Sequence, residues 1–505
     1  MTTPLRLFNS LTRELEPFAP VHANEARVYS CGPTVYNYPH IGNMRAYVFA
    51  DVLGRTLSWR GYSLTHVINI TDVGHLTDDA DAGEDKLEKA ARANAQSIWD
   101  IARHYTEAYW ADIAALNIRQ PAHWSIATDY IQPMIEFAQS IAGRHCYQLD
   151  SGLYFDTSTV ADYGRLARAH TEEGEGRIEA VEGKRNAADF AIWRTTPSGE
   201  TRAMEWDSPW GRGAPGWHLE CSVMSGQLLG FPFDIHTGGI DHREIHHPNE
   251  IAQNQAFCCT GPLTDPVNSG ARIWMHNNFL VERSGKMSKS SGEFLRLQLL
   301  IERGYHPLAY RLMCLQAHYR SELEFSWEGL GAALVRLKRM VMAVESLKAR
   351  RAEAGPPGSA EAASATPEQG WTLARTSEAE WGRLAPLLER FDAALADDLN
   401  TAVALTALED ALAAKKVDLE TKLALAGAMD AVLGLNLLGL ARADLRLRPA
   451  EAAIDEGEIA EALARRQEAR AAKDFAASDA IREQLAARGV EVMDGDPLGW
   501  EWKLG

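Results

Sequence analysis

The chain is 505 residues long, so several domains are expected. Its net charge of −18 argues against indiscriminate binding to nucleic acid, although an acidic protein can carry a local basic face. No apolar run is long enough to cross a bilayer and residues 1–20 lack the apolar core of a secretory signal, so we expect a cytoplasmic protein with no membrane partner. Six cysteines are too few for a disulfide scaffold, which leaves buried thiols or metal ligands.

The first 72 residues predict a β-α-β unit, preceded by a lead-in (residues 1–22) that would add a strand. Residues 26–30 are a β-rich run, and the apolar spacing of residues 44–53 predicts a buried helix. Residues 61–72 predict a second strand that ends in a polar loop. This order implies a parallel sheet, and such sheets bind ligands beyond the carboxyl ends of their strands.

The turn between the first strand and the helix is a candidate phosphate site. His40 and Gly42 fall at or near the helix start, where free N–H groups and a partial positive charge suit a phosphate. A glycine there would let a base or ribose approach the backbone. Taken alone, this stretch fits an ordinary turn with a surface histidine equally well.

The middle of the chain indicates a domain inserted between two halves of the sheet. The acidic run at residues 78–85 lacks the spacing of a calcium loop and indicates a solvated loop. After it, residues 86–145 have a helical pattern, and 146–216 are mixed, with a short strand at 152–156. The sheet pattern resumes at 216–221, followed by a strand at 231–241 that ends in a glycine loop, a helix that carries residues 246–253, and a last strand at 273–281.

The last third of the chain is predicted to be helical. One helix has the 4-3-4-3 apolar spacing of a bundle seam, formed by Leu330, Leu334, Leu337, Val341 and Val344. The same helix carries a basic face, for which RNA contact and simple solvation are equal alternatives: Arg336, Lys338, Arg339, Lys348, Arg350 and Arg351. Residues 352–370 predict a flexible linker. Residues 455–505 predict a small module of two short helices, stopped by Gly489, then an extended stretch and the Trp500/Trp502 pair.

A second phosphate candidate is Lys286-Met287-Ser288-Lys289-Ser290. Two lysines three residues apart, with hydroxyls between them and glycines on both sides, would close over a triphosphate and neutralise charge as pyrophosphate leaves. Alone, a solvated loop explains this run more simply. This run comes later in the chain than the first phosphate candidate, at residues 31–43, and each of the two follows a predicted strand. Together, the two candidates indicate a site that binds and cleaves a nucleotide.

These two motifs resemble His-Ile-Gly-His and Lys-Met-Ser-Lys-Ser of the class I aminoacyl-tRNA synthetases, and more narrowly the sequence is similar to the cysteinyl-tRNA synthetase family. The resemblance covers nearly the whole chain and rests on residues 31–36, 69–72, 216–221, 246–250, 286–290, 470–476 and 480–482. Three departures stand out: Asn43 replaces the second histidine of the first motif, Pro248 stands where the family often has Glu, and the acidic run is an insertion without an assigned role. Asparagine still donates a hydrogen bond, so we expect function to survive.

The resemblance implies an α/β fold with a Rossmann-like parallel-sheet catalytic domain, an inserted connective domain, a C-terminal α-helical bundle and a small α+β module. The expected boundaries are 1–120 and 216–262 for the two halves of the catalytic domain and 121–215 for the insertion. They are 263–325 for the region of the Lys-Met-Ser-Lys-Ser loop, which would also contact the tRNA stem, 326–440 for the anticodon-side bundle with its linker, and 441–505 for the tRNA-binding module.

The resemblance also implies one zinc ion per chain, held by Cys31, Cys221, His246 and Glu250. His246 and Glu250 are four residues apart and share a helix face, and sulfur, imidazole and carboxylate all suit zinc. Buried apolar thiols and a purely structural zinc are the alternatives. Because Cys31 lies nine residues before His40, the metal would sit beside the phosphate site.

Zinc beside an amino-acid pocket would separate cysteine from serine. Shape alone distinguishes them weakly, whereas translation needs a factor of roughly 10⁴, about 5.5 kcal/mol. A zinc-bound substrate thiolate would supply it, so no hydrolytic editing domain is expected. Trp217 would wall the pocket, unless it is a core tryptophan.

The implied reaction is activation of L-cysteine with ATP and Mg²⁺ to cysteinyl-adenylate, then transfer to the 3'-terminal adenosine of tRNA(Cys) by a monomer. The catalytic residues would be His40, Asn43, Lys286 and Lys289. ATP would contact Thr34, His40, Gly42, Asn43, Gly238, Gly239, Asp241, Lys286 and Lys289. One alternative is a cysteine ligase that acts on an amino sugar; the helical region and the module at residues 455–505 argue against it. The other is a non-catalytic tRNA-binding paralogue; the intact run at residues 286–290 and the four candidate ligands argue against it.

Overall fold

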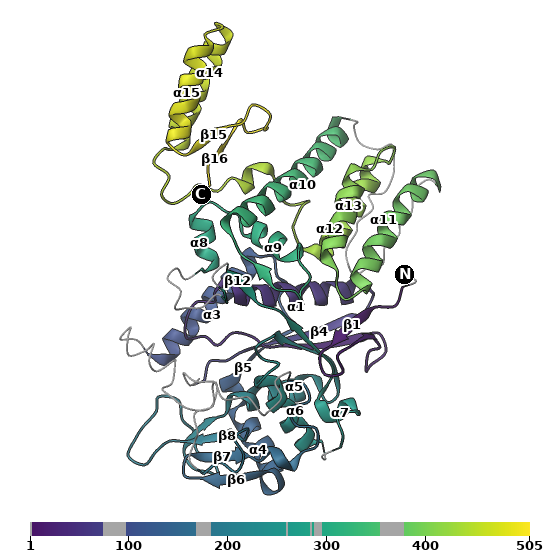
Figure 1. The fold of residues 1–505 in the computed structure, drawn as a ribbon, viewed down its shortest axis with the longest axis vertical. Helices are drawn as coiled ribbons and strands as arrows, with labels where there is room; N and C mark the ends of the chain where they lie inside the picture. Colours follow the sequence, from purple (N-terminus) through teal and green to yellow (C-terminus); the bar gives the residue numbers. More distant parts are fainter. Residues whose placement is uncertain are drawn as a thin grey trace.

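A five-stranded parallel sheet forms the centre of the molecule (Figure 1). The computed structural model describes residues 3–73, 97–167, 183–258, 261–282, 285–286, 295–353 and 378–504. The sheet order is β11-β10-β3-β4-β5, with bounds Ala271–Asn277, Phe233–Gly239, Glu25–Ser30, Ser63–Ile70 and His123–Ile126. Every neighbouring pair is parallel, which confirms the predicted sheet.

Helix α1 (Ile41–Trp59) connects β3 to β4 and begins one residue after His40, where the sequence predicts a helix start. Its Leu53 and Leu57 are buried in one cluster with Val28 of β3 and Ile235 of β10. The helix therefore packs across the sheet, and its N-terminus lies at the edge formed by the carboxyl ends of the strands.

Three sequence predictions of secondary structure are wrong in part. Residues 86–145 are not helical throughout: between α3 (Ile98–Ala115) and α4 (Ile131–His145) the chain forms β5, which extends the main sheet beyond residue 120. Residues 217–221 begin helix α5 (Trp217–Leu229) rather than a strand. The last predicted strand divides after Asn277, and the following β12 joins another sheet. Four-residue elements such as β5 are too short for periodicity to identify.

The inserted part forms its own antiparallel sheet, at the lower end of Figure 1. Its strands, in sheet order, are β6 (Cys146–Leu149), β7 (Gly152–Phe155), β8 (Phe190–Thr195) and β9 (Gly213–Pro215). The chain then returns to the main sheet through α5, β10, α6 (His246–Phe257), α7 (Pro266–Ser269) and β11. The N-terminal lead-in forms the hairpin β1 (Arg6–Asn9) and β2 (Glu14–Pro17), so it adds two strands.

A small sheet, β13-β12-β14 (Gly285–Lys286, Leu280–Glu282, Leu323–Glu324), precedes the helical region. That region comprises α8 (Leu297–Glu302), α9 (Pro307–Leu315), α10 (Trp327–Glu353), α11 (Glu378–Ala396), α12 (Thr401–Ala413) and α13 (Leu419–Leu433). All five residues of the predicted α10 seam are at most 2% exposed, which confirms it. Residues 352 and 353 complete α10, and the described structure contains no more of the predicted linker.

Much of the basic face of α10 is paired within the chain. Arg336 forms an ion pair with Glu409 at 2.7 Å, and Arg351 forms one with Glu420. Lys338 forms another with Glu501 of the terminal module at 2.5 Å. This face therefore contributes to intramolecular packing.

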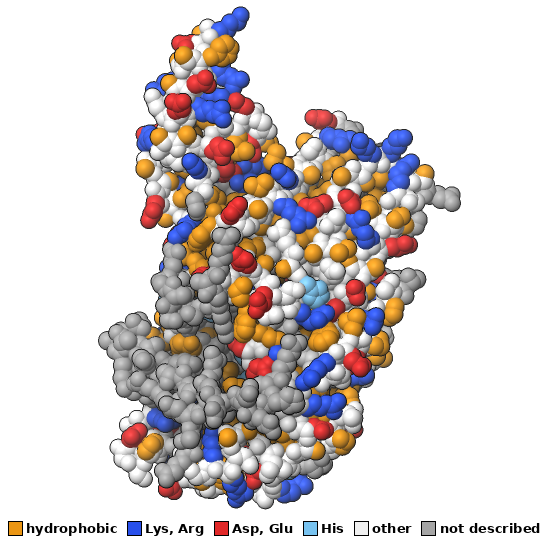
Figure 2. Space-filling model, in the orientation of Figure 1, with side chains coloured by type: hydrophobic (Ala, Val, Ile, Leu, Met, Phe, Trp, Pro, Cys, Tyr) orange, Lys and Arg blue, Asp and Glu red, His pale blue; other side chains and the backbone are white. Residues whose placement is uncertain are grey.

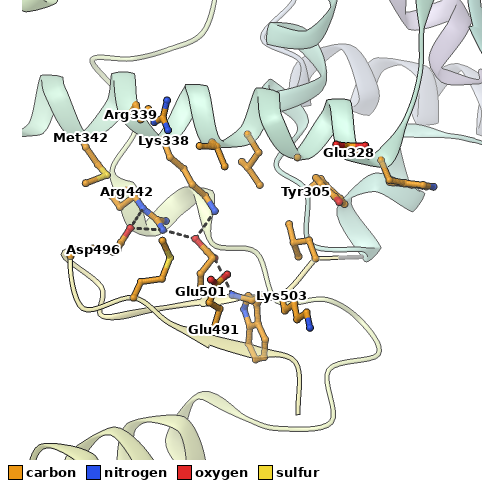
Figure 3. Close-up of a pocket in the computed structure, with 18 residues that line it drawn as sticks. Tyr305, Glu328, Lys338, Arg339, Met342, Arg442, Glu491, Asp496, Glu501 and Lys503 are labelled. Atoms are coloured by element: carbon orange, nitrogen blue, oxygen red, sulfur yellow. Dashed lines mark hydrogen bonds and ion pairs between the residues drawn. The ribbon is translucent and has the colours of Figure 1, made fainter. Parts of the chain in front are cut away.

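The terminal module comprises α14 (Glu456–Ala471), α15 (Phe475–Ala487) and the hairpin β15 (Val490–Val492) and β16 (Trp500–Trp502). Gly489, at φ +83°, separates α15 from the hairpin, as predicted. Figure 3 shows where the module meets α10: Arg442 contacts Asp496 at 2.9 Å and Glu501 at 2.5 Å, beside a cavity of about 770 Å³. Among the described residues, we find no helix with the length and apolarity that crossing a bilayer requires.

Candidate active site and metal centre

The loop after β3 rests directly on the end of β4. A Cβ atom on Gly32 would lie 1.6 Å from the carbonyl oxygen of Asn69, so no other residue fits there. The loop continues past Thr34 as a short bridge, in which Val35 N donates to Thr71 O (3.1 Å) and Thr71 N donates to Pro33 O (3.0 Å). Close packing of the two chain segments thus fixes where the chain leaves Cys31.

His40 and Asn43 cap the start of α1. Asn43 N donates to His40 Nδ1, and His40 N donates to Asn43 Oδ1, both at 3.2 Å. A Cβ on Gly42 would lie 2.8 Å from His40 Nδ1, so the imidazole lies across this glycine. Asn43 is exposed, and Ile41 N donates to Leu295 O at 2.8 Å. The two polar side chains thus lie together at a helix N-terminus, the part of a helix that favours anions.

The structure brings Cys31, Cys221, His246 and Glu250 together, with their ligand atoms all within 4.8 Å of one another. Cys31 is half-buried at the end of β3, and the other three are buried on α5 and α6. A second set with the same spread replaces Cys221 and His246 by His236 and His247. Neither histidine is among the predicted site residues; His236 lies within β10, and only its packing against α6 brings it to Glu250.

The cluster is tightly connected. His246 Nε2 and His236 Nε2 each lie 2.9 Å from a different oxygen of Glu250. The Sγ atom of Cys31 lies 3.3 Å from His247 Nε2. The other ring nitrogens contact further histidines: His246 Nδ1 lies 3.0 Å from His218 Nδ1, and His247 Nδ1 lies 2.7 Å from His276 Nε2. Such outer contacts orient imidazole rings around a metal ion.

The surroundings favour the charged forms of Glu250, His246 and Cys31 and the neutral thiol of Cys221. Burial raises the pKa of Glu250, but the neighbouring His236 and His246 outweigh it and bring this pKa down to about 2. Burial lowers the pKa of His246, but Glu250 and Cys31 raise it to about 10. Burial and the nearby Cys31 raise the pKa of Cys221, whereas contact with Cys221 and His247 holds the pKa of Cys31 well below its ordinary value despite burial.

The donor set fits a borderline-soft divalent cation. Two sulfurs, one imidazole and one carboxylate are typical of zinc sites, and their spread suits a single ion. Glu250 Oε1 is buried; its 2.9 Å contact with His246 Nε2 does not have hydrogen-bond geometry, and no other described residue donates to it. A cation between these atoms would satisfy that oxygen and neutralise the thiolates.

Trp217, Gly238 and Gly239 lie beside this cluster. The Trp217 ring packs 4.2 Å, between centroids, from that of His246. A Cβ on Gly238 would lie 2.7 Å from His247 Cε1, so the glycine makes room for the histidines. A Cβ on Gly239 would lie 2.4 Å from an oxygen of Asp241, which is exposed just after β10. For Lys286 only the backbone, in β13, is described; Lys289 and the acidic run at 78–85 lie outside the described residues.

Together, the parallel sheet, the capped helix start and the cluster beside it are those of a class I tRNA synthetase. Residues 17–334 match the model of the tRNA synthetases class I (C) catalytic domain, and residues 456–497 match that of the cysteinyl-tRNA ligase anticodon binding domain. The chain belongs to the cysteine–tRNA ligase family.

Relatives of similar length support this assignment. The cysteine–tRNA ligase of Novosphingobium aromaticivorans is 75% identical over 100% of this chain and 98% of its own length. That of Zymomonas mobilis is 56% identical over 99% of this chain and 98% of its own length. Among solved structures, a Mycobacterium tuberculosis methionyl-tRNA synthetase in complex with methionyl-adenylate has the same fold at a TM-score of 0.52 and 16% identity, covering 81% of this chain and 88% of its own.

Proposed function

We propose that this protein activates L-cysteine with ATP and transfers it to the 3'-terminal adenosine of tRNA(Cys). The observation that carries this proposal is the cluster of Cys31, Cys221, His246 and Glu250 at the edge of the sheet where α1 begins. At this edge a metal that selects a thiol would lie beside a helix start that binds phosphate. Membership of the family over the whole chain supports the same reaction.

The four clustered residues would hold one zinc ion, which supplies a soft Lewis acid for the substrate thiolate. Trp217, packed on His246, would wall the amino-acid pocket. The carboxylate of cysteine attacks the α-phosphorus of ATP, and the bond to the departing pyrophosphate breaks. His40 and Asn43 would hold phosphate oxygens at the start of α1, and Lys286 and Lys289 would neutralise the charge that develops.

Adenosine and Mg²⁺ complete the proposed ATP site. Thr34 and Gly42 would flank the phosphates, while Gly238, Gly239 and Asp241 lie at or just after the end of β10, where the adenosine would bind beyond the strand. Mg²⁺ would accompany the phosphates of ATP.

The partner would be tRNA(Cys), bound by a monomer. On the face shown in Figure 2, Lys and Arg side chains gather near the far ends of α10 and α13, which gives an acidic protein a local basic surface; over α14 and α15 they are mixed with Asp and Glu. The match of residues 456–497 to an anticodon binding domain supports a tRNA substrate over an amino sugar.

Cysteine-dependent exchange of pyrophosphate into ATP, followed by charging of total tRNA, tests the proposal. Exchange and charging together are expected. Absence of exchange would contradict the enzymatic proposal, and exchange without charging would favour the amino-sugar ligase.

For Lys289→Ala we expect a loss of pyrophosphate exchange of roughly 10²–10³-fold in kcat, because one donor to the developing charge is removed. The Michaelis constant for cysteine should change little, since the pocket is untouched. Lys348→Ala, on α10 and bonded to Leu438 O, is the matched control and should exchange at the wild-type rate. Equal rates for the two variants would exclude a role for Lys289.

For Arg442→Ala we expect charging to weaken while pyrophosphate exchange is retained. Arg442 is 2% exposed and joins Asp496 and Glu501 where the module meets α10, so its loss removes the ion pair of Asp496, leaves Glu501 with Lys338 alone and loosens the module. The KM for tRNA is expected to rise about tenfold, the equivalent of about 1.4 kcal/mol. A parallel loss of exchange would show instead that the substitution disturbs the catalytic domain.

A further inference from the structure

A chain of buried hydrogen bonds links the two cysteines of the cluster. Gly32 N donates to Asn69 Oδ1 at 2.7 Å, and Asn69 Nδ2 donates to Thr71 Oγ1 at 3.1 Å. Thr71 Oγ1 then donates to Glu220 Oε2 at 2.8 Å. Since Gly32 follows Cys31 and Glu220 precedes Cys221, the chain ends at the immediate neighbours of both thiols.

The three side chains that form this series of hydrogen bonds are buried. Asn69 and Thr71 are 2% exposed, and Glu220 is 1% exposed. Solvent therefore cannot replace a lost hydrogen bond, and each broken bond would leave a buried polar group unsatisfied. The chain is consequently a stiff connection between the end of β4 and the first turn of α5.

Asn69 suits the central position because its amide both accepts and donates a hydrogen bond. Its oxygen accepts from a peptide N–H group, and its nitrogen donates to a hydroxyl. An aspartate in its place offers acceptors only, so it would hold Gly32 but compete with Glu220 for the single proton of Thr71. The isosteric change therefore breaks the chain while keeping the volume of the side chain.

The metal cluster needs such a connection. One metal ion can bind both sulfurs only if Cys31 and Cys221 keep the spacing of the cluster, in which the ligand atoms lie within 4.8 Å of one another. Backbone bonds hold Cys31 on one side, through Cys31 N to Thr237 O at 3.1 Å. On the other side, Gly32 N is held by Asn69.

We propose that Asn69 is a positioning residue, which sets Cys31 relative to Cys221 so that both sulfurs bind one metal ion and thereby secure the preference for cysteine over serine. The inference rests on the proposed function, because the spacing of the two sulfurs affects substrate choice only if zinc selects the substrate. Asn69 acts through its bond to Gly32 and, by way of Thr71, through Glu220.

The test compares Asn69→Asp with Asn268→Asp. Asn268 is a matched control, because its buried amide donates to Pro262 O at 3.1 Å, away from the cluster. Zinc affinity is measured by competition with a chelating dye, thermal unfolding is recorded for both variants, and the exchange assay gives the ratio of cysteine to serine activation. We expect Asn69→Asp to bind zinc roughly 10–100-fold more weakly and to lose selectivity in parallel, whereas Asn268→Asp should keep both.

Wild-type zinc affinity in Asn69→Asp, or an equal loss in Asn268→Asp, would overturn the inference. If Asn69→Asp does not fold, Thr71→Val removes the middle hydroxyl at nearly constant volume, and the same loss is expected. Glu220→Gln retains an acceptor for Thr71 and should stay closer to wild type than Asn69→Asp; the reverse order would contradict the chain. Wild-type protein that binds zinc but exchanges no pyrophosphate would contradict the proposed function and leave the zinc comparison valid.

Discussion

Cys221→Ser is expected to abolish stable zinc binding and most of the discrimination against serine. The wild-type preference needed for translation is roughly 10⁴, whereas shape alone separates such similar side chains by about 10–200-fold. Removal of one sulfur from the set of Cys31, Cys221, His246 and Glu250 leaves a hydroxyl that binds zinc poorly. The ratio of exchange with cysteine to exchange with serine should therefore fall by about 10²-fold or more, and metal analysis should find little zinc.

Cys146→Ser provides the control, because Cys146 is a half-buried thiol in β6 that belongs to neither candidate metal group. It should retain zinc and selectivity. Removal of zinc from the wild-type protein by a chelator should reproduce the Cys221→Ser ratio, and this separates the metal from any packing defect. If Cys221→Ser keeps its zinc and still rejects serine, the assignment of the metal ligands is wrong.

The sequence predicted the centre of the fold because that centre follows from local patterns. A β-rich run, a glycine-proline turn and an apolar helical spacing are enough to predict β3, α1 and β4 as a β-α-β unit with parallel strands. The α10 seam was predicted for the same reason, since its five residues repeat at helical spacing and are all buried. Short elements without a period, such as β5, were missed because pairing with β4 creates them.

The metal site was predicted only through the family resemblance. Cys31 and Cys221 are 190 residues apart, and spacing alone does not indicate a shared metal. The histidines of the second group were missed for a related reason: His236 belongs to a buried strand, where an isolated histidine is usually a core residue, and only the packing of α6 on β10 brings it 2.9 Å from Glu250. Which residues share the cluster is decided by contacts between segments far apart in the sequence, and local sequence patterns do not predict those contacts.

Arg311→Met is expected to destabilise the protein by about 3–5 kcal/mol, because it breaks a fully buried ion pair and leaves carbonyl groups without a donor. Arg311, on α9, lies 2.6 Å from Asp51 Oδ2 of α1 and donates to Leu433 O at 2.7 Å and Leu116 O at 3.0 Å. A single side chain thus fastens the helical bundle to the catalytic domain. Arg390→Met is the control: its pair with Asp410 is roughly half exposed and should contribute about 0–1 kcal/mol.

The same network gives a pH dependence with a definite sign. Burial raises the pKa of Asp51, but Arg311 and Arg55 outweigh it, so this pKa lies below its ordinary value in the folded protein. A carboxyl group with a lowered folded pKa contributes stability that is complete above the unfolded pKa of about 4 and is lost as the pH falls through the folded value. Urea unfolding of the wild type below pH 4 should therefore show this loss, and Arg311→Met should show less of it, because its Asp51 has lost the strongest of its partners. An identical pH dependence in the two proteins would mean that Arg55 and Arg119, not Arg311, hold the charge of Asp51.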